Sequence, residues 1–369
     1  MDGRAFGRNN GPVITDLAEV TPAWLTQVLR HSGALPAGQV TGVGVDAKPT
    51  YTSTVARLAL TYSAGAPPTV PTCLFLKLAR PASTQRVVGN AQRRHEVEFH
   101  NRVAAMMPHP LVVRCHHAAY AEETGACHLL FDDVSQTHFT APSTSPPDLP
   151  RCESAMDAFA AFHAFWWDSA SLPEVASVPT PESVARDVAA IRDCYPGFVD
   201  FAAARLTAPQ RRWYDGALDA LPRLYQRVAD GRNRRALTLI HGDANLSNVM
   251  LPRDVGHEQT LLIDWQLWGV SFAAEDLAHL IALYWPKPVR DATERGLLKR
   301  YHEGLLRHGV QGYTWEDCWA DYRLAGILRV LFMPMWFWNS GAPVESVWRS
   351  LGSAMQAFED LGCAELLDG

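Results

Sequence analysis

Two stretches of the chain decide its fold: LIHGDANLSNVM at residues 239–250 and LLIDWQ at residues 261–266. In the first, Asp243 and Asn248 lie in a short polar loop between two apolar runs, and in the second Asp264 follows another apolar run. Short apolar runs bounded by turn-forming residues are typical of buried strands. We therefore predict three strands around a rigid loop, at residues 237–240, 249–251 and 260–263.

The residue types in this loop point to phosphoryl transfer. That reaction requires a carboxylate to accept the proton of the attacking hydroxyl, and oxygen ligands to hold Mg²⁺ on the phosphates. Asp243 suits the first task, and Asn248 with Asp264 suits the second. The pattern predicts a kinase of a small molecule that uses ATP and Mg²⁺. The alternative is that Asp243 and Asn248 only bond to their own backbone, as loop residues often do.

The composition is that of an ordinary globular protein, with 369 residues of which 47% are hydrophobic and 20% charged. Such a chain is long enough for two lobes, each with its own core. The formal net charge of −6 argues against a nucleic-acid partner, because phosphate backbones require clustered Lys and Arg. The seven cysteines are scattered without a Cys-x-x-Cys pair, which argues against a zinc ribbon or a disulfide framework.

No apolar segment approaches the length needed to cross a bilayer. The most apolar run, Ile327 to Trp338, is interrupted by Arg329 and Pro334. Residues Met1 to Gly11 are polar and lack the apolar core of a signal peptide. We therefore expect a cytoplasmic protein without a membrane partner.

The first 133 residues predict a small antiparallel β lobe with one helix inserted in it. A leading helix is expected at 20–31, with Thr21 as its N-cap. The expected strands, by period-2 alternation and apolar runs, are 40–45, 53–62, 72–78, 111–120 and 127–131, and the inserted helix is 86–107. This lobe, residues 1–133, is expected to cover a nucleotide.

After Asp133 helical patterns dominate, and the strands beside the loop are the only ones expected there. The expected helices are 152–168, 181–193, 209–230, 275–283, 289–308, 315–337 and 344–361. Residues 134–369 therefore predict a large, mainly helical lobe for catalysis and substrate binding. The fold class is α+β, with two lobes and a ligand site expected in the cleft between them.

Lys77 lies within the apolar run CLFLKLA at 73–79. A buried lysine is costly unless it is paired, and in a kinase it is paired with the nucleotide phosphates and a carboxylate on the next helix. Glu96 and Glu98 are the candidates on that helix; we favour Glu96, but Glu98 remains open. The alternative is that Lys77 points to solvent from an edge strand.

Further nucleotide-binding candidates come from two other segments. KPTYTST at 48–54 has the position of a phosphate-covering turn but contains no glycine, so Ser53 and neighbouring hydroxyls are the candidate donors. Phe131, Asp132 and Asp133 form the expected hinge, where backbone groups would meet the adenine edge.

Three polar residues have expected structural roles around the loop. His241 is expected to orient it, and His163 to pack beneath it. Asp276 is expected either to cap its helix or to accept hydrogen bonds from the loop backbone.

At this point the chain resembles the aminoglycoside phosphotransferase and choline kinase superfamily, and within it the ecdysteroid kinase-like branch. The resemblance extends from about Tyr51 to the helix that begins at Trp315. The matching residues are Tyr51-Thr52-Ser53 with Arg57, Lys77, Glu96 with Phe99, LLFDDV at 129–134, His163-Ala164, His241-Gly242-Asp243 with Asn248, Asp264-Trp265-Gln266 and Asp276-Leu277-Ala278. The resemblance implies ATP-dependent transfer to a hydroxyl, with Mg²⁺, on a two-lobed protein-kinase-like fold.

The chain departs from the family pattern in three places. Lys48 stands where a glycine usually precedes the Tyr-x-Ser segment, so the phosphate-covering turn is expected to differ. His100 replaces a tyrosine, and Asp132 replaces a glutamate at the hinge. None of these changes removes a residue assigned to the metal or to proton transfer, which argues against a silent nucleotide-binding protein.

The acceptor is the open question. The helical part is rich in aromatic residues, above all in LFMPMWFW at 331–338, which forms either a pocket wall or part of the core. A pocket wall predicts a partly apolar, natural-product-like alcohol. An aminoglycoside is the second choice, because a polycation requires clustered carboxylates and these are dispersed here. A choline-like amino alcohol in an aromatic cage also remains open.

Overall fold

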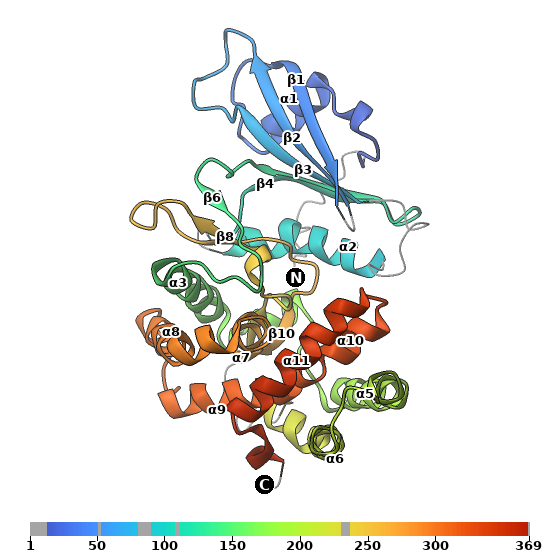
Figure 1. Cartoon of the computed structure of the whole chain (residues 1–369). Coiled ribbons are helices and arrows are strands. Elements are labelled where there is room, and N and C mark those ends of the chain that lie inside the picture. Colours follow the sequence, from blue (N-terminus) through green and yellow to red (C-terminus); the bar gives the residue numbers. More distant parts are fainter. Residues whose placement is uncertain (1–12, 51–52, 80–89, 108–110, 230–236, 368–369) are drawn as a thin grey trace, which may run out of the picture. The chain divides into compact units, whose positions relative to one another are not determined.

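The computed structural model describes residues 13–50, 53–79, 90–107, 111–229 and 237–367 (Figure 1). The chain divides into two compact units. Unit 1 comprises residues 1–138 and 263–267, and unit 2 comprises residues 139–262 and 268–369. The sequence predicts the division between 133 and 134, and it does not predict that the segment carrying Asp264 returns to the first unit.

Unit 1 is built on a five-stranded antiparallel sheet with the order β1-β2-β3-β5-β4. Its strands are β1 (Val40–Pro49), β2 (Ser53–Tyr62), β3 (Cys73–Ala79), β4 (Cys115–Tyr120) and β5 (Cys127–Asp132). The predicted antiparallel lobe is confirmed. β4 begins later than the expected residue 111. Leu111 and Val113 are buried but lie outside the strand, so their apolar character reflects packing and not strand pairing.

The alternation of side chains along β3 explains why a lysine interrupts an apolar strand. Leu74, Leu76 and Leu78 belong to the core under α1 (Pro22–His31), whose predicted Thr21 cap accepts from the backbone N–H of Trp24. Because successive side chains of a strand point to opposite faces, Lys77 lies on the other face of the sheet.

The second face carries α2 (Asn90–Glu98), with Val97 packed in a small core with Leu129. The single helix predicted over 86–107 is wrong in its second half. The chain changes to a π-helical segment at Phe99–Val103 and to a 3₁₀ turn at Ala104–Met106, while 86–89 lies outside the described residues. The ring of Trp265 stacks on Phe99 with 3.9 Å between centroids, and π-helical bulges often mark such functional contacts.

Unit 2 is mainly helical, as predicted. Its α-helices are α3 (Leu149–Trp166), α4 (Leu172–Val175), α5 (Pro181–Ala202), α6 (Ala208–Ala229), α7 (Ala274–Leu277), α8 (Lys287–Arg307), α9 (Trp315–Ala325), α10 (Met333–Asn339) and α11 (Val344–Asp360). The single helix expected over 315–337 is interrupted by a π-helical segment at Gly326–Leu331. Pro334 then lies in the first turn of α10, where its missing N–H has no helical partner to lose.

Unit 2 contains more strands than the sequence predicts. The expected strands are present as β7 (Leu237–Ile240), β8 (Val249–Pro252) and β9 (Leu261–Leu262). Two others were missed: β10 (Gly269–Phe272) pairs with β7, and β6 (His138–Phe139) adjoins β8. β6 has two residues and β10 has four, which is too short for alternation to identify a strand.

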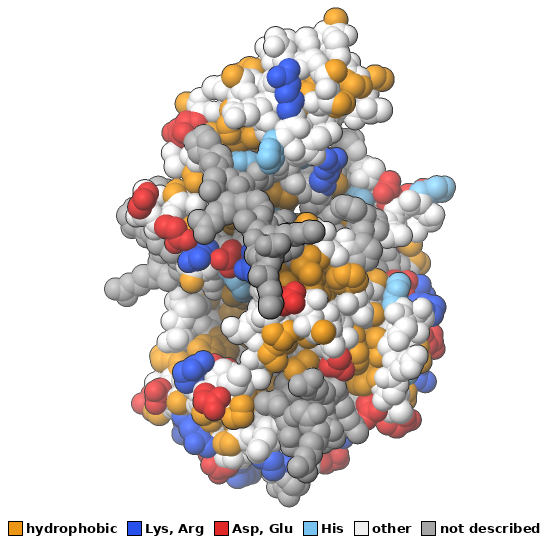
Figure 2. Space-filling model, turned by 180° about the vertical axis from the view of Figure 1, so that it is seen from behind, with side chains coloured by type: hydrophobic (Ala, Val, Ile, Leu, Met, Phe, Trp, Pro, Cys, Tyr) orange, Lys and Arg blue, Asp and Glu red, His pale blue; other side chains and the backbone are white. Residues whose placement is uncertain are grey.

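On the face drawn in Figure 2, the acidic and basic side chains of the described residues are interspersed. All seven cysteines are free thiols. Among the described residues no helix combines the length and the apolar character that a membrane span requires.

Candidate active site

The loop between β7 and β8 is fixed by a buried aspartate from α7. Asp276 accepts the backbone N–H of His241 on Oδ2 at 2.6 Å and that of Gly242 on Oδ1 at 2.9 Å. Gly242 has a φ of 78°, a left-handed conformation that glycine adopts without strain. Of the two structural roles open to Asp276, the structure shows the second, acceptance from the loop backbone.

A histidine of α3 contacts the carboxylate of Asp276. His163 is fully buried, with Nε2 at 3.2 Å from Asp276 Oδ2 and Nδ1 at 2.8 Å from the hydroxyl of Tyr301. Although burial raises it, the contact with His163 and the hydrogen bonds to the loop bring the pKa of Asp276 below its ordinary value. His241 accepts the N–H of Asp243 on its own Nδ1 at 3.3 Å, which is the loop-orienting contact expected of it.

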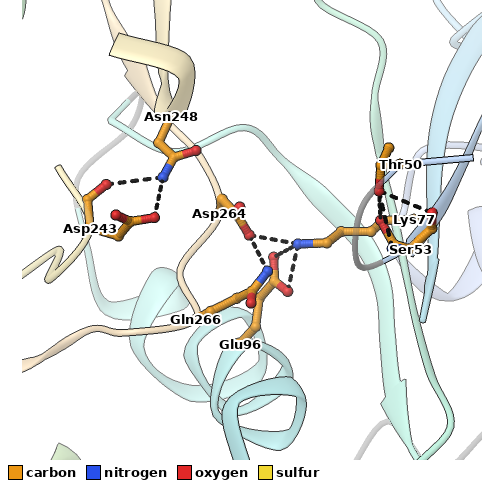
Figure 3. Close-up of polar contacts among 8 residues, drawn as sticks. All are labelled: Thr50, Ser53, Lys77, Glu96, Asp243, Asn248, Asp264 and Gln266. Atoms are coloured by element: carbon orange, nitrogen blue, oxygen red, sulfur yellow. Dashed lines mark hydrogen bonds and ion pairs between the residues drawn. The ribbon is translucent and has the colours of Figure 1, made fainter. Parts of the chain in front are cut away.

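Asp243 and Asn248 meet across this loop (Figure 3). The amide Nδ2 of Asn248 donates to the backbone oxygen of Asp243 and to its Oδ2, both at 2.9 Å. This leaves the amide oxygen of Asn248 without a hydrogen bond to the described residues. Asn245 caps the 3₁₀ turn at Leu246–Asn248 and so fixes the direction of Asn248.

The second oxygen of Asp243 faces a histidine that the sequence analysis missed. The ring Nε2 of His279 lies 3.4 Å from Asp243 Oδ1. Although burial raises it, His279 and the positive charge of Arg329 bring the pKa of Asp243 below its ordinary value. Asp243 is therefore ionised at neutral pH, as a proton acceptor must be. We call Asp243, Asn248, Asp276, His279 and Arg329 the loop cluster.

The other polar cluster lies in unit 1, around Lys77. Its Nζ contacts both carboxylate oxygens of Glu96 at 2.8 Å and Oδ1 of Asp264 at 2.6 Å (Figure 3). Gln266 donates to the same oxygen of Asp264 at 2.6 Å. We call Lys77, Glu96, Asp264 and Gln266 the Lys77 cluster.

These contacts decide two questions that the sequence left open. Glu96 pairs with Lys77, whereas Glu98 pairs with Arg94 at 3.0 Å on the same helix. The side chain of Lys77 is only 17% exposed, so it does not point to solvent from an edge strand.

The Lys77 cluster carries one cation between two carboxylates. Burial lowers the pKa of Lys77, but Asp264 and Glu96 raise it above its ordinary value, so the ammonium stays protonated. Burial, with the added charge of Asp264, raises the pKa of Glu96 to about 7 against the pull of Lys77. Asp264 itself has a φ of 66°, and left-handed backbone in a residue other than glycine is often found at functional sites.

The expected phosphate-covering turn is closed by hydroxyl groups instead of glycine. Thr50 Oγ1 lies 2.9 Å from Ser53 Oγ and accepts the Ser53 N–H at 3.0 Å (Figure 3). The hydroxyl of the buried Ser53 is thus already engaged within the turn. Tyr51 and Thr52, part of the family-like segment, lie outside the described residues.

The carboxylates of the expected hinge are occupied within unit 1. Asp132 contacts His116 Nε2 at 2.7 Å, and Asp133 pairs with Arg57. The backbone N–H of Asp132 donates to the carbonyl of Arg114 at 3.0 Å, and Phe131 lies within β5.

Each unit offers an oxygen donor of the kind that a hard divalent cation prefers. The free amide oxygen of Asn248 and Oδ2 of Asp264 are oxygen ligands of the kind Mg²⁺ prefers, and Mg²⁺ commonly binds to few protein groups plus phosphates. Within the described residues no group of three or more His, Cys, Asp or Glu side chains could hold a metal.

Two hollows in unit 2 adjoin the loop cluster through Tyr284. The ring of Tyr284 lies 5.4 Å from that of His279, and it lines hollows of about 230 Å³ and about 500 Å³. Phe337 lines the smaller one, and Arg349 lines both. The aromatic run 331–338 therefore has both expected roles. Its first five residues are buried in the core, whereas Phe337 lines a hollow.

Comparison with known families gives a match over residues 50–310, which fit the sequence profile of the ecdysteroid kinase-like family. The chain belongs to this family. It is an enzyme, a phosphotransferase that acts on an alcohol group of a small molecule. The resemblance predicted from the sequence is thus confirmed.

Solved structures show the same fold at low sequence identity. A putative aminoglycoside phosphotransferase from Ralstonia eutropha is 14% identical, with a TM-score of 0.56, and the match covers 94% of this chain and 98% of that one. The GDP complex of aminoglycoside 2′-phosphotransferase-IIIa is 11% identical, with a TM-score of 0.52 and coverage of 92% and 99%. A microcompartment-associated aminopropanol kinase is 13% identical, with a TM-score of 0.50 and coverage of 91% and 95%. A comparison with curated protein sequences gives no match.

Proposed function

We propose that the protein transfers the γ-phosphate of ATP to a hydroxyl of a small, partly apolar alcohol, with Asp243 as the general base. The observation that carries this proposal is the state of Asp243: it is ionised, held by Asn248, and carried on a loop whose backbone is bonded to the buried Asp276. Positioning and electrostatics account for most of the catalysis of phosphoryl transfer, so a rigidly held carboxylate suits it.

In the proposed reaction the acceptor hydroxyl donates its proton to Asp243. Its oxygen forms the new bond to the γ-phosphorus while the bond to the β–γ bridging oxygen breaks, and ADP leaves with that electron pair. Asn248 and Asp264 are the proposed ligands of Mg²⁺, which would neutralise charge on the phosphates. In favour of this pairing, Val249 next to Asn248 pairs with Leu262, two residues before Asp264.

The Lys77 cluster is proposed to bind the nucleotide. Lys77 would donate to the α- and β-phosphates, with Glu96 holding its ammonium in place. Ser53, Phe131, Asp132 and Asp133 are proposed as further nucleotide contacts; residues 1–133 would thus cover the nucleotide, and 134–369 would bind the acceptor.

The hollows beside Tyr284 support a partly apolar acceptor over an aminoglycoside. Their described lining includes Tyr284, Phe337 and the cations Lys287, Arg290 and Arg349, and no carboxylate. Lys287 and Arg290 are already paired with Asp360, so the described lining offers a polycationic acceptor no carboxylate of its own, whereas the aromatic side chains suit an alcohol with an apolar body.

The test is Mg²⁺-dependent ADP release from ATP with a panel of acceptors: terpenoid and steroid alcohols, amino alcohols and aminoglycosides. We expect turnover with the apolar alcohols and loss of that turnover in Asp243→Asn. Turnover with aminoglycosides alone would contradict the proposed acceptor class. ATP binding without turnover on any member would favour a non-catalytic nucleotide-binding protein.

A further inference from the structure

One arginine of unit 2 joins two parts of the loop cluster. Arg329 lies in the π-helical segment Gly326–Leu331, and its guanidinium donates to the backbone oxygen of Gly242. Its Nε donates to Nδ1 of His279 at 2.9 Å. The same side chain therefore contacts the catalytic loop directly and the histidine that faces Asp243.

The contact with Arg329 fixes the tautomer of His279. A guanidinium has only donors and keeps its charge in proteins, so the ring nitrogen that it contacts must be an unprotonated acceptor. In a neutral ring the single proton then resides on Nε2. His279 is 1% exposed, and burial with the charge of Arg329 lowers its pKa, which keeps the ring neutral.

The protonated nitrogen is the one that faces the proposed base. His279 Nε2 lies 3.4 Å from Asp243 Oδ1, somewhat longer than a formed hydrogen bond, as is common before substrate binds. The other oxygen of Asp243 accepts from Asn248. Each oxygen of the carboxylate therefore faces a donor, and a second lone pair on each remains for the acceptor hydroxyl.

We propose that Arg329 and His279 form a positioning pair, in which Arg329 sets the His279 tautomer and the Nε2–H of His279 orients the carboxylate of Asp243 toward the acceptor hydroxyl. This inference rests on the proposed function of Asp243. His279 remains neutral throughout and transfers no proton. In many hydrolases a carboxylate orients the histidine that acts as the base. In this protein the roles are reversed, because the histidine orients the carboxylate.

The test compares His279→Gln with His279→Leu. The amide of glutamine offers a donor toward Asp243 and an acceptor toward Arg329, whereas leucine offers neither. We expect His279→Leu to lower kcat by about 10- to 100-fold, the effect of one hydrogen bond to a charged group, with the KM for ATP unchanged. His279→Gln should recover most of the lost kcat.

A matched control is His302→Leu, which removes another buried histidine of unit 2, one whose Nε2 lies 2.9 Å from the backbone oxygen of Tyr313. We expect it to lower the thermal midpoint and leave kcat intact. Full kcat in His279→Leu, or an equal loss of kcat in folded His279→Gln and His279→Leu, would overturn the proposal.

NMR determines the tautomer of His279 without any measurement of activity. The result can therefore contradict this inference while the proposed function stands. In ¹⁵N-histidine-labelled protein at pH 7, with the signal assigned through His279→Gln, we expect a proton on Nε2 and none on Nδ1. Arg329→Met should relax this to a mixture of tautomers. A proton on Nδ1 in the wild type would overturn the proposal even if the enzyme turns over normally.

Discussion

The two polar clusters each contain two carboxylates and one cation, and they differ in how the carboxylates are held. In the loop cluster both oxygens of Asp276 accept backbone N–H groups, and the oxygens of Asp243 face one donor each. In the Lys77 cluster one ammonium serves two carboxylates, and Asp264 is 35% exposed. The carboxylates of the first cluster are therefore held by separate donors, whereas those of the second share one ammonium.

We therefore expect the two clusters to have different roles in the reaction. Carboxylates that face separate, fixed donors keep their geometry and require little reorganisation during the reaction, which suits the group that accepts the proton. In the Lys77 cluster two carboxylates share a single ammonium, so a bound cation would stabilise them, and the lysine can exchange a carboxylate for a phosphate. We therefore expect changes in the loop cluster to affect turnover and stability, and changes in the Lys77 cluster to affect nucleotide binding.

The largest effect is expected for Asp243→Asn. Removal of the general base should lower kcat by about 10²–10⁴, since this is the usual contribution of general acid–base catalysis. The affinity for ATP with Mg²⁺, measured by calorimetric titration, should stay close to that of the wild type. A variant that turns over at the wild-type rate would remove the proton-transfer role from the loop cluster.

Lys77→Met should act on binding. The loss of charged hydrogen bonds to phosphate is expected to raise the KM for ATP by about 10- to 100-fold. Steady-state kinetics with ATP varied at saturating acceptor provides the measurement. An unchanged KM with a reduced kcat would reverse the division between the two clusters.

Asp276→Asn should act on stability. The amide can accept only on one side, so a buried N–H loses its partner, and the free energy of unfolding should fall by about 1–3 kcal/mol. Urea denaturation followed by tryptophan fluorescence measures this change.

The pH dependence of that loss provides its control. Because the pKa of Asp276 is lowered by folding, its contribution is present at pH values above about 3.8 and is lost as the pH falls through the lowered pKa. The difference between wild type and Asp276→Asn should therefore shrink below pH 4. A difference that grows on acidification would contradict the assigned contacts.

The smallest effect is expected from a matched pair of substitutions on α2. Glu98→Gln removes a partly exposed ion pair with Arg94 and should leave the KM for ATP unchanged. Glu96→Gln removes the buried partner of Lys77 and should raise that KM several-fold. Equal effects from the two variants would mean that the Lys77–Glu96 contact has no part in nucleotide binding.

Local patterns were sufficient to predict much of this molecule. The position of Lys77 within the apolar run 73–79 predicted a paired lysine as one of two possibilities, and its contact with Glu96 confirms this one. The apolar runs that flank Asp243 likewise predict β7 and β8. These features depend on periodicities of a few residues, which the sequence shows directly.

What the sequence did not predict depends on contacts between distant segments. β10 is recognisable only through its pairing with β7, and the π-helical segment at Phe99 accompanies the stacking of Trp265 on its ring. Arg329 did interrupt the most apolar run, as Lys77 interrupted its strand. The sequence therefore shows Arg329 as a cation that requires a partner. It does not show that this partner is His279.

The central claim is that this protein moves a phosphoryl group from ATP to an alcohol through Asp243. The most direct measurement is ³¹P NMR of ATP, Mg²⁺ and the best acceptor of the panel, with wild type and Asp243→Asn side by side. The account predicts a new phosphate-ester signal that grows with ADP in the wild type and is nearly absent in the variant. An ester signal that grows equally fast in Asp243→Asn, or ADP that appears only with inorganic phosphate, would contradict it.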